Sequence, residues 1–169
     1  IYTLFFGDIM YAVGDIVQDF TLPNQDGEMI TLSSFLGQKV LVWFYPKAST
    51  PGCTAEGCSL RDNFTTLQSS NVVVLGISKD SVRRQKNFVD KHSFPYDLLA
   101  DTEGVVVQAF GAWGPKRFMG REYEGIIRSS FLINEQGMVE HVFATVKTKT
   151  HGEDVIAALN ALTTQQPPQ

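Results

Sequence analysis

The chain has 169 residues, of which 43% are hydrophobic and 19% are charged, and its net charge is −4. This length and apolar content suit one compact domain with a sizeable core. Lys and Arg form no run longer than Arg83-Arg84, which argues against a nucleic-acid partner or a polybasic membrane contact. No apolar run approaches the roughly 18 residues of a membrane span.

The composition of the two ends predicts a single domain with short flanking segments. The first nine residues are apolar, without the basic leader and small-residue cleavage site of a signal peptide. We expect residues 1–12 to be an N-terminal extension or a cloning remnant, with Met10 as the native start, and residues 13–162 to form the domain. Residues 163–169 are rich in Gln and Pro and are expected to be disordered.

The chain contains two cysteines, Cys53 and Cys58. Two cysteines in a chain of this length do not resemble the disulfide framework of small secreted domains. Without a signal peptide, the reducing cytoplasm is the expected compartment. A cysteine pair there is more often redox-active or metal-binding than a structural staple.

The first half of the chain predicts a hairpin, a strand, a helix and a second strand. Residues 20–22 and 29–32 flank strong turn residues and form the hairpin, and Ser33 could cap a short helical turn after it. A continuous apolar run at 40–45 predicts a strand buried on both faces. A helix from Thr50 to Asn71 follows, with an apolar face at Leu60, Phe64 and Leu67, and then a buried strand at 72–77.

The second half continues this alternation of strands and helices. We expect a helix capped by Ser81 that runs to about His92, with one face formed by Val82, Lys86 and Val89. The remaining expectations are a strand at 95–99, a helix at 105–110, a loop at 114–125, two strands at 129–133 and 139–144 joined by a turn, and a last helix carrying Val155, Ile156, Leu159 and Leu162. The order predicts an α/β thioredoxin-like fold, a central mixed sheet flanked by helices with an added N-terminal β-hairpin.

Cys53 stands where the strand at 40–45 gives way to the following helix. The free N–H groups and positive dipole end of a helix N-terminus stabilise a thiolate. Pro51 suits a helix start, Gly52 leaves room for a small substrate, and Thr50 places a hydroxyl near the sulfur. This pattern favours a nucleophilic Cys53 over the alternative, a small buried hydrophobe.

Cys58 lies five residues beyond Cys53 on the same predicted helix. Five residues of ideal helix correspond to a rise of about 7.5 Å and a rotation of about 140°, which separates the two Cα atoms by roughly 8–9 Å. A disulfide usually needs less than about 7 Å. If the two sulfurs bond, the first turns of the helix must unwind, so reduced and oxidised forms should differ in local helicity. The alternative is an inert buried thiol.

Arg128 is the other candidate, because a charged side chain next to a core strand is costly unless it is paired. It could hold a thiolate and polarise a peroxide oxygen, or it could be a solvated strand end. Glu56 could complement the helix dipole. The three histidines (His92, His141 and His151) are expected to be surface or structural residues, and no second cysteine pair or nearby histidine completes a zinc site.

These residues resemble the signature of the peroxiredoxins: a Pro, a Thr four residues later and a Cys three beyond that, here Pro46, Thr50 and Cys53. The string TPGCTAEGC, the stretch from Phe110 to Asn134 and VKTKTHGEDVIAAL are similar to the bacterioferritin comigratory protein (PrxQ) subfamily. The resemblance extends from about Val13 to Leu162.

The resemblance implies a thioredoxin fold and a thiol peroxidase that needs no metal, haem or flavin cofactor. Cys53 would match the peroxidatic cysteine and Cys58 the resolving cysteine of many members. Arg128 would stabilise the thiolate and the peroxide, Thr50 would hydrogen-bond the peroxide and Pro46 would shield the sulfur. The implied partners are hydrogen peroxide or an organic hydroperoxide and a thioredoxin-like dithiol, and the implied state is a monomer.

Two other functions stay open at this point. One is a protein thiol–disulfide oxidoreductase of thioredoxin-like fold, against which the four residues between Cys53 and Cys58 count, because a thioredoxin-type pair has two. The other is a binding domain whose cysteines take no part in redox chemistry. Peroxide-dependent loss of free thiols that is absent in a Cys53→Ser variant would exclude the second.

Overall fold

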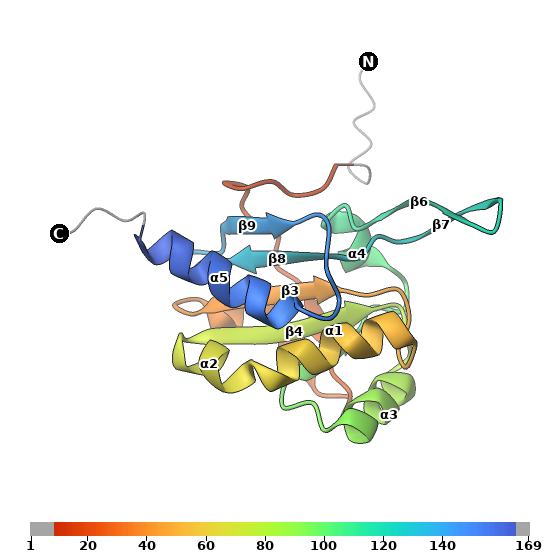
Figure 1. The fold of residues 1–169 in the computed structure, drawn as a ribbon, viewed down its shortest axis with the longest axis horizontal. Coiled ribbons are helices and arrows are strands. Elements are labelled where there is room, and N and C mark those ends of the chain that lie inside the picture. The colour runs from red at the N-terminus through yellow and green to blue at the C-terminus, as the bar shows by residue number, and fades with distance from the viewer. Residues whose placement is uncertain (1–8, 165–169) are drawn as a thin grey trace, which may run out of the picture.

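The computed structural model describes residues 9–164 and is built around a five-stranded mixed sheet of order β5-β4-β3-β8-β9 (Figure 1). The central strand β3 pairs in parallel with β4 and antiparallel with β8, so the sheet changes direction beside it. This sheet confirms the predicted α/β, thioredoxin-like architecture. Its strands are β3 (Lys39–Phe44), β4 (Val72–Ser78), β5 (Asp97–Ala100), β8 (Ser129–Ile133) and β9 (Val139–Phe143).

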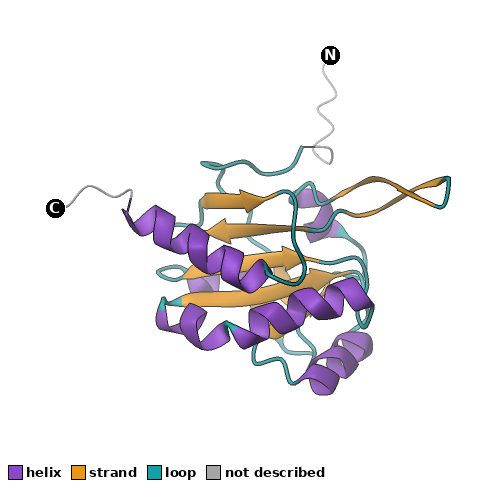
Figure 2. Cartoon of the chain, in the orientation of Figure 1, coloured by secondary structure: helices purple, strands orange, loops and turns teal. Residues whose placement is uncertain are grey.

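Two apolar clusters, one on each face of the sheet, form the core. Alternate side chains of β3 enter opposite clusters because successive residues of a strand point to opposite faces: Val42 and Phe44 lie in one, Leu41 and Trp43 in the other. The first cluster includes α4 (Val105–Ala109), and the second is covered by α1 (Pro51–Asp62), α2 (Phe64–Ser69), α3 (Val82–His92) and α5 (His151–Thr164). Figure 2 shows α1 and α5 lying in front of the sheet.

The predicted helix from Thr50 to Asn71 is two helices. α1 ends at Asp62 and α2 starts at Phe64, with Asn63 between them at φ −106° and ψ 7°. The Asn63 side chain donates to the Ser59 carbonyl at 2.8 Å and to Glu153 of α5 at 3.2 Å. Asn favours such local bonds to the backbone over continued helix, which explains the interruption.

The expectation of a loop at residues 114–125 is wrong. The segment forms a hairpin of β6 (Trp113–Phe118) and β7 (Arg121–Ile126), which extends away from the body of the molecule in Figure 1. Met119 and Gly120 both have positive φ, as a two-residue type I′ turn requires. Most of its side chains are exposed, so the strands lack the apolar alternation that identifies a half-buried strand.

Several smaller expectations can be compared with the structure. The N-terminal hairpin is present as β1 (Thr21–Pro23) and β2 (Met29–Thr31), and a 3-10 turn η1 (Leu32–Phe35) follows, although Thr31 rather than Ser33 is its cap residue. Ser81 does cap α3, accepting a bond from the Arg84 N–H. The predicted face of α3 is correct in part: Val89 packs against the second apolar cluster, whereas Lys86 is exposed and the fully buried residues are Gln85 and Phe88.

The predicted end segments are described only in part. Residues 1–8 of the predicted extension and 165–169 of the predicted tail lie outside the described residues. Met10 and Tyr11, which precede the predicted domain, pack against the core, and the Tyr11 ring meets Phe110 edge-on at 5.0 Å. No helix within residues 9–164 is long and apolar enough to cross a membrane.

Candidate active site

Cys53 occupies the first turn of α1, as the sequence predicts. Thr50 is the cap residue, and its carbonyl accepts the first helical bond, from the Thr54 N–H at 2.8 Å. The N–H of Cys53 is therefore one of the N–H groups at the helix start that have no intrahelical acceptor. The side chain is 1% exposed and lies in the second core cluster, with a free thiol. A buried sulfur at the positive end of a helix is placed for stabilisation of a thiolate.

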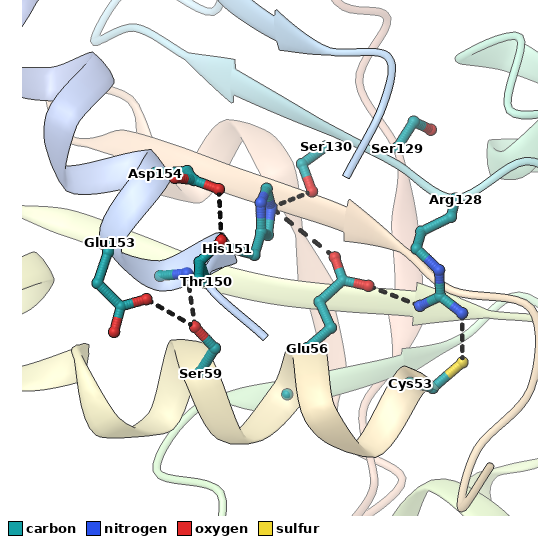
Figure 3. A network of polar contacts seen from close by, with 12 residues as sticks. Cys53, Glu56, Ser59, Arg128, Ser129, Ser130, Thr150, His151, Glu153 and Asp154 are labelled. Carbon is teal, nitrogen blue, oxygen red and sulfur yellow. Dashed lines mark hydrogen bonds and ion pairs between the residues drawn. The ribbon is translucent and has the colours of Figure 1, made fainter. Parts of the chain in front are cut away.

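Arg128 lies in the turn between β7 and β8, and its guanidinium reaches the sulfur of Cys53. Its Nη2 is 3.4 Å from Cys53 Sγ, across 75 residues of sequence (Figure 3). Gly52 leaves room for this approach, because a Cβ there would lie 3.1 Å from Nη2, which is closer than an ordinary contact. The Arg128 side chain is about three-quarters buried, which reduces the screening of its charge by water.

Glu56 is the partner of Arg128 that sequence reasoning missed. Its side chain is fully buried, and Oε1 accepts a bond from Arg128 Nη1 at 2.8 Å. It lies beyond the first turn of α1, so its predicted role in complementing the helix dipole is replaced by this ion pair. One guanidinium thus bridges a carboxyl and a thiol through different nitrogens, which fixes the direction in which it presents its charge.

A buried histidine lies beside Glu56. His151 opens α5 and is 1% exposed, so of the two expected alternatives, a surface or a structural residue, the surface one does not apply to this histidine. Its Nε2 lies 2.7 Å from Ser130 Oγ and 3.7 Å from Glu56 Oε2 (Figure 3). The only sequence signal is that His151 directly precedes the last apolar-periodic helix, which is too weak to reveal the contact.

Burial shifts the pKa values of Glu56 and His151 in opposite directions. It raises the pKa of Glu56 to about 7, although the bond and charge of Arg128 act against this rise. It lowers the pKa of His151 to about 4, which the charge of Arg128 reinforces and that of Asp154 opposes. The imidazole is therefore neutral at pH 7, and the carboxyl titrates there.

A buried polar network supports the loop that leads into Cys53. The N–H of Ala48 donates to Asp80 Oδ2 at 2.8 Å, and the Ser78 hydroxyl donates to the same oxygen at 2.7 Å. Gln85 continues the network by donating to Ser78 Oγ at 2.9 Å and accepting from the Tyr45 hydroxyl. These contacts fix the loop between β3 and α1 against β4.

The other predicted residues lie around the same loop. Pro46 follows β3 and is half-buried. The Thr50 hydroxyl donates to the Lys47 carbonyl at 2.7 Å, which leaves its oxygen free to accept a further bond. Cys58 is a half-buried free thiol, and both cysteines lie in the unbroken helix α1. Closure of a disulfide from this arrangement requires loss of helical geometry between them.

A mixed sheet with a cysteine at the N-terminus of the helix that follows its central strand defines a thiol-bearing protein of the thioredoxin-like class. Residues 13–142 match the AhpC/TSA family, and the chain belongs to this family. It is 50% identical over 143 residues to the peroxiredoxin Bcp of Escherichia coli K12, covering 85% of this chain and 92% of that protein.

Solved structures agree with this membership. A cysteine-to-serine mutant of Xylella fastidiosa PrxQ superposes with a TM-score of 0.87 at 30% identity, covering 93% of this chain and 99% of that one. A structure of the bacterioferritin comigratory protein of Xanthomonas campestris, described in terms of its alkyl peroxide reduction activity, has a TM-score of 0.81 at 32% identity, covering 88% and 99%. The predicted resemblance to the peroxiredoxins is confirmed.

Proposed function

We propose that the protein is a thioredoxin-dependent peroxidase that reduces hydrogen peroxide and organic hydroperoxides with Cys53 as its nucleophile. The observation that carries the proposal is the 3.4 Å contact between the Arg128 guanidinium and Cys53 Sγ at the start of α1. A cation and a helix N-terminus both favour the thiolate, which is the form that attacks a peroxide.

In the first step, the Cys53 thiolate attacks the terminal oxygen of the hydroperoxide. An S–O bond forms and the O–O bond breaks, and the attacked oxygen keeps its hydrogen, so that Cys53 becomes a sulfenic acid. The leaving oxygen takes a proton from solvent to give water or an alcohol. Arg128 stabilises the charge as it moves along the O–O bond. Thr50, whose hydroxyl donates to Lys47, accepts a bond from the peroxide O–H, and Pro46 shields the sulfur from water.

In the second step, Cys58 attacks the sulfenic sulfur, releases water and forms an intramolecular disulfide with Cys53. The turns of α1 between the two residues unwind for this, because both lie on one helix in the reduced form. A thioredoxin-like dithiol then reduces the disulfide by exchange and is itself oxidised. No cofactor takes part. The proposed enzyme is a cytoplasmic monomer, and light scattering tests its oligomeric state.

Peroxide turnover coupled to thioredoxin, thioredoxin reductase and NADPH tests this function. We expect activity in the parent and none in Cys53→Ser. Cys58→Ser should consume one equivalent of peroxide and form a trappable sulfenic acid, but recycle poorly with thioredoxin. Full thioredoxin-dependent turnover in Cys58→Ser would contradict the resolving role. Insulin reduction without any peroxide turnover would instead favour a protein disulfide oxidoreductase.

A further inference from the structure

The proposed mechanism uses Cys53, Arg128 and Thr50 but gives no role to the buried histidine behind them. His151 belongs to α5, whereas Glu56 belongs to α1 and Arg128 precedes β8, so three separate elements meet at the Glu56 carboxyl. Figure 3 shows the order of contacts: the sulfur, the guanidinium, the carboxyl and the imidazole. Because each of these groups contacts the next, a change in the position of the imidazole can alter the position of the guanidinium at the sulfur.

The carboxyl of Glu56 is held firmly at one oxygen only. Oε1 accepts from Arg128, but Oε2 has no hydrogen-bond partner in the described part of the chain, and His151 Nε2 faces it at 3.7 Å. A buried carboxyl oxygen without a partner is costly, and removal of a facing polar group would raise that cost. The imidazole is therefore placed to limit where Oε2 can lie.

The orientation of the imidazole is itself fixed. Ser130 Oγ lies 2.7 Å from Nε2, and the Phe143 ring packs against the imidazole edge-on at 5.1 Å. These contacts hold Nε2 beside Ser130 and 3.7 Å from Glu56 Oε2, while Nδ1 has no hydrogen-bond partner among residues 9–164. Nε2 has one hydrogen-bonding position, which Ser130 Oγ occupies, so the imidazole acts on Oε2 through packing and charge rather than through a hydrogen bond.

We propose that His151, oriented by Ser130, is a positioning residue for the peroxidase reaction. It holds the Glu56 carboxyl in place, and the carboxyl in turn keeps the Arg128 guanidinium directed at Cys53 Sγ. The inference rests on the proposed function. It predicts that a change at His151, which does not touch the sulfur, alters the reactivity of Cys53.

The test uses His151→Leu, which removes the ring nitrogens, and His151→Gln, which keeps a side-chain amide near Oε2. Each is made with Cys58→Ser, so that Cys53 alone reacts. The readouts are the second-order rate of sulfenic acid formation with hydrogen peroxide at pH 7 and the pH profile of that rate. We expect His151→Leu to slow oxidation about tenfold and to change the pH profile, and His151→Gln to recover most of the rate.

His92→Leu is the matched control, because His92 lies on α3 and its ring contacts Phe88 and Phe94 rather than Phe143. It should leave both readouts at the parental value. Folding is checked by circular dichroism, and Ser130→Ala provides a second, milder perturbation of the same contact with an expected loss of about threefold. A folded His151→Leu protein with the parental rate and the parental pH profile overturns the proposal. Absence of peroxide oxidation in the parent would instead overturn the proposed function.

Discussion

Replacement of either member of the Glu56–His151 pair should change the slope of the free energy of unfolding against pH. The two replacements should change this slope in opposite directions. In the folded protein the pKa of Glu56 is about 7 and that of His151 is about 4, against ordinary values of 4.5 and 6.5. Between about pH 4.5 and 6.5 the folded pair carries one proton on the carboxyl, whereas the unfolded chain carries one on the imidazole.

Both states of the parent therefore bind the same number of protons across this window, and the pair contributes almost no slope. In Glu56→Gln only the imidazole titrates. The unfolded state then binds the extra proton, so stability is lost as the pH falls from 6.5 to 4, by up to ~1.4 kcal/mol per pH unit and about 3 kcal/mol in all.

In His151→Leu only the carboxyl titrates, and the sign reverses. The folded state binds the extra proton between pH 4.5 and 7, so stability is fully present at acid pH and falls by about 3 kcal/mol as the pH rises through this window. Burial is the largest cause of both pKa shifts, and neither group is among the causes of the other's shift, so each shift should survive loss of its neighbour.

Urea unfolding of the reduced protein at half-unit steps from pH 4.5 to 7.5 measures these slopes. Subtracting the parent's free energy of unfolding from that of each variant removes the contribution of all other titrating groups. His141→Leu serves as the control here. Parallel pH profiles for Glu56→Gln, His151→Leu and the parent would refute the reasoning, because they would mean that neither group changes its pKa on folding.

Three further changes have expected outcomes. Arg128→Lys loses the planar fork that contacts Glu56 and Cys53 through separate nitrogens, and should slow sulfenic acid formation, measured by rapid mixing with peroxide, about a hundredfold. Gly152→Ala places a Cβ 2.4 Å from the Ser59 carbonyl oxygen, and this backbone clash should outweigh the better helix propensity of Ala, with a net loss of about 2 kcal/mol in urea unfolding. Asp80→Ala leaves the Ala48 N–H without its acceptor, and should cost about 1–3 kcal/mol of stability in thermal unfolding and slow Cys53 oxidation in the same rapid-mixing assay.

Local patterns in the sequence predict much of this fold. The apolar run at 40–45 and the alternating elements around it correspond to the central sheet, and the loop-to-helix position of Cys53 is reproduced in α1. These features depend on neighbouring residues, so periodicity and capping signals are sufficient to find them. The peroxiredoxin resemblance rests on the same short segments.

The features that were missed depend on contacts between distant segments. Glu56 meets Arg128 across 72 residues, and Ser130 meets His151 from a different element, so no local pattern marks them as partners. The β6–β7 hairpin was missed for a different reason, since exposed side chains on both faces give no alternation. Buried polar networks of this kind become visible only once the packing of the elements is known.

Glu56 lies between Cys53 and Cys58, inside the segment of α1 that must lose its helical turns when the two sulfurs join. Unwinding would carry its carboxyl from a buried site into water, where its pKa returns toward 4.5. Near pH 7 the carboxyl would then release a proton, so disulfide closure is linked to proton release and alkaline conditions favour it. The group that steadies Arg128 during peroxide attack would thus make the resolving step respond to pH.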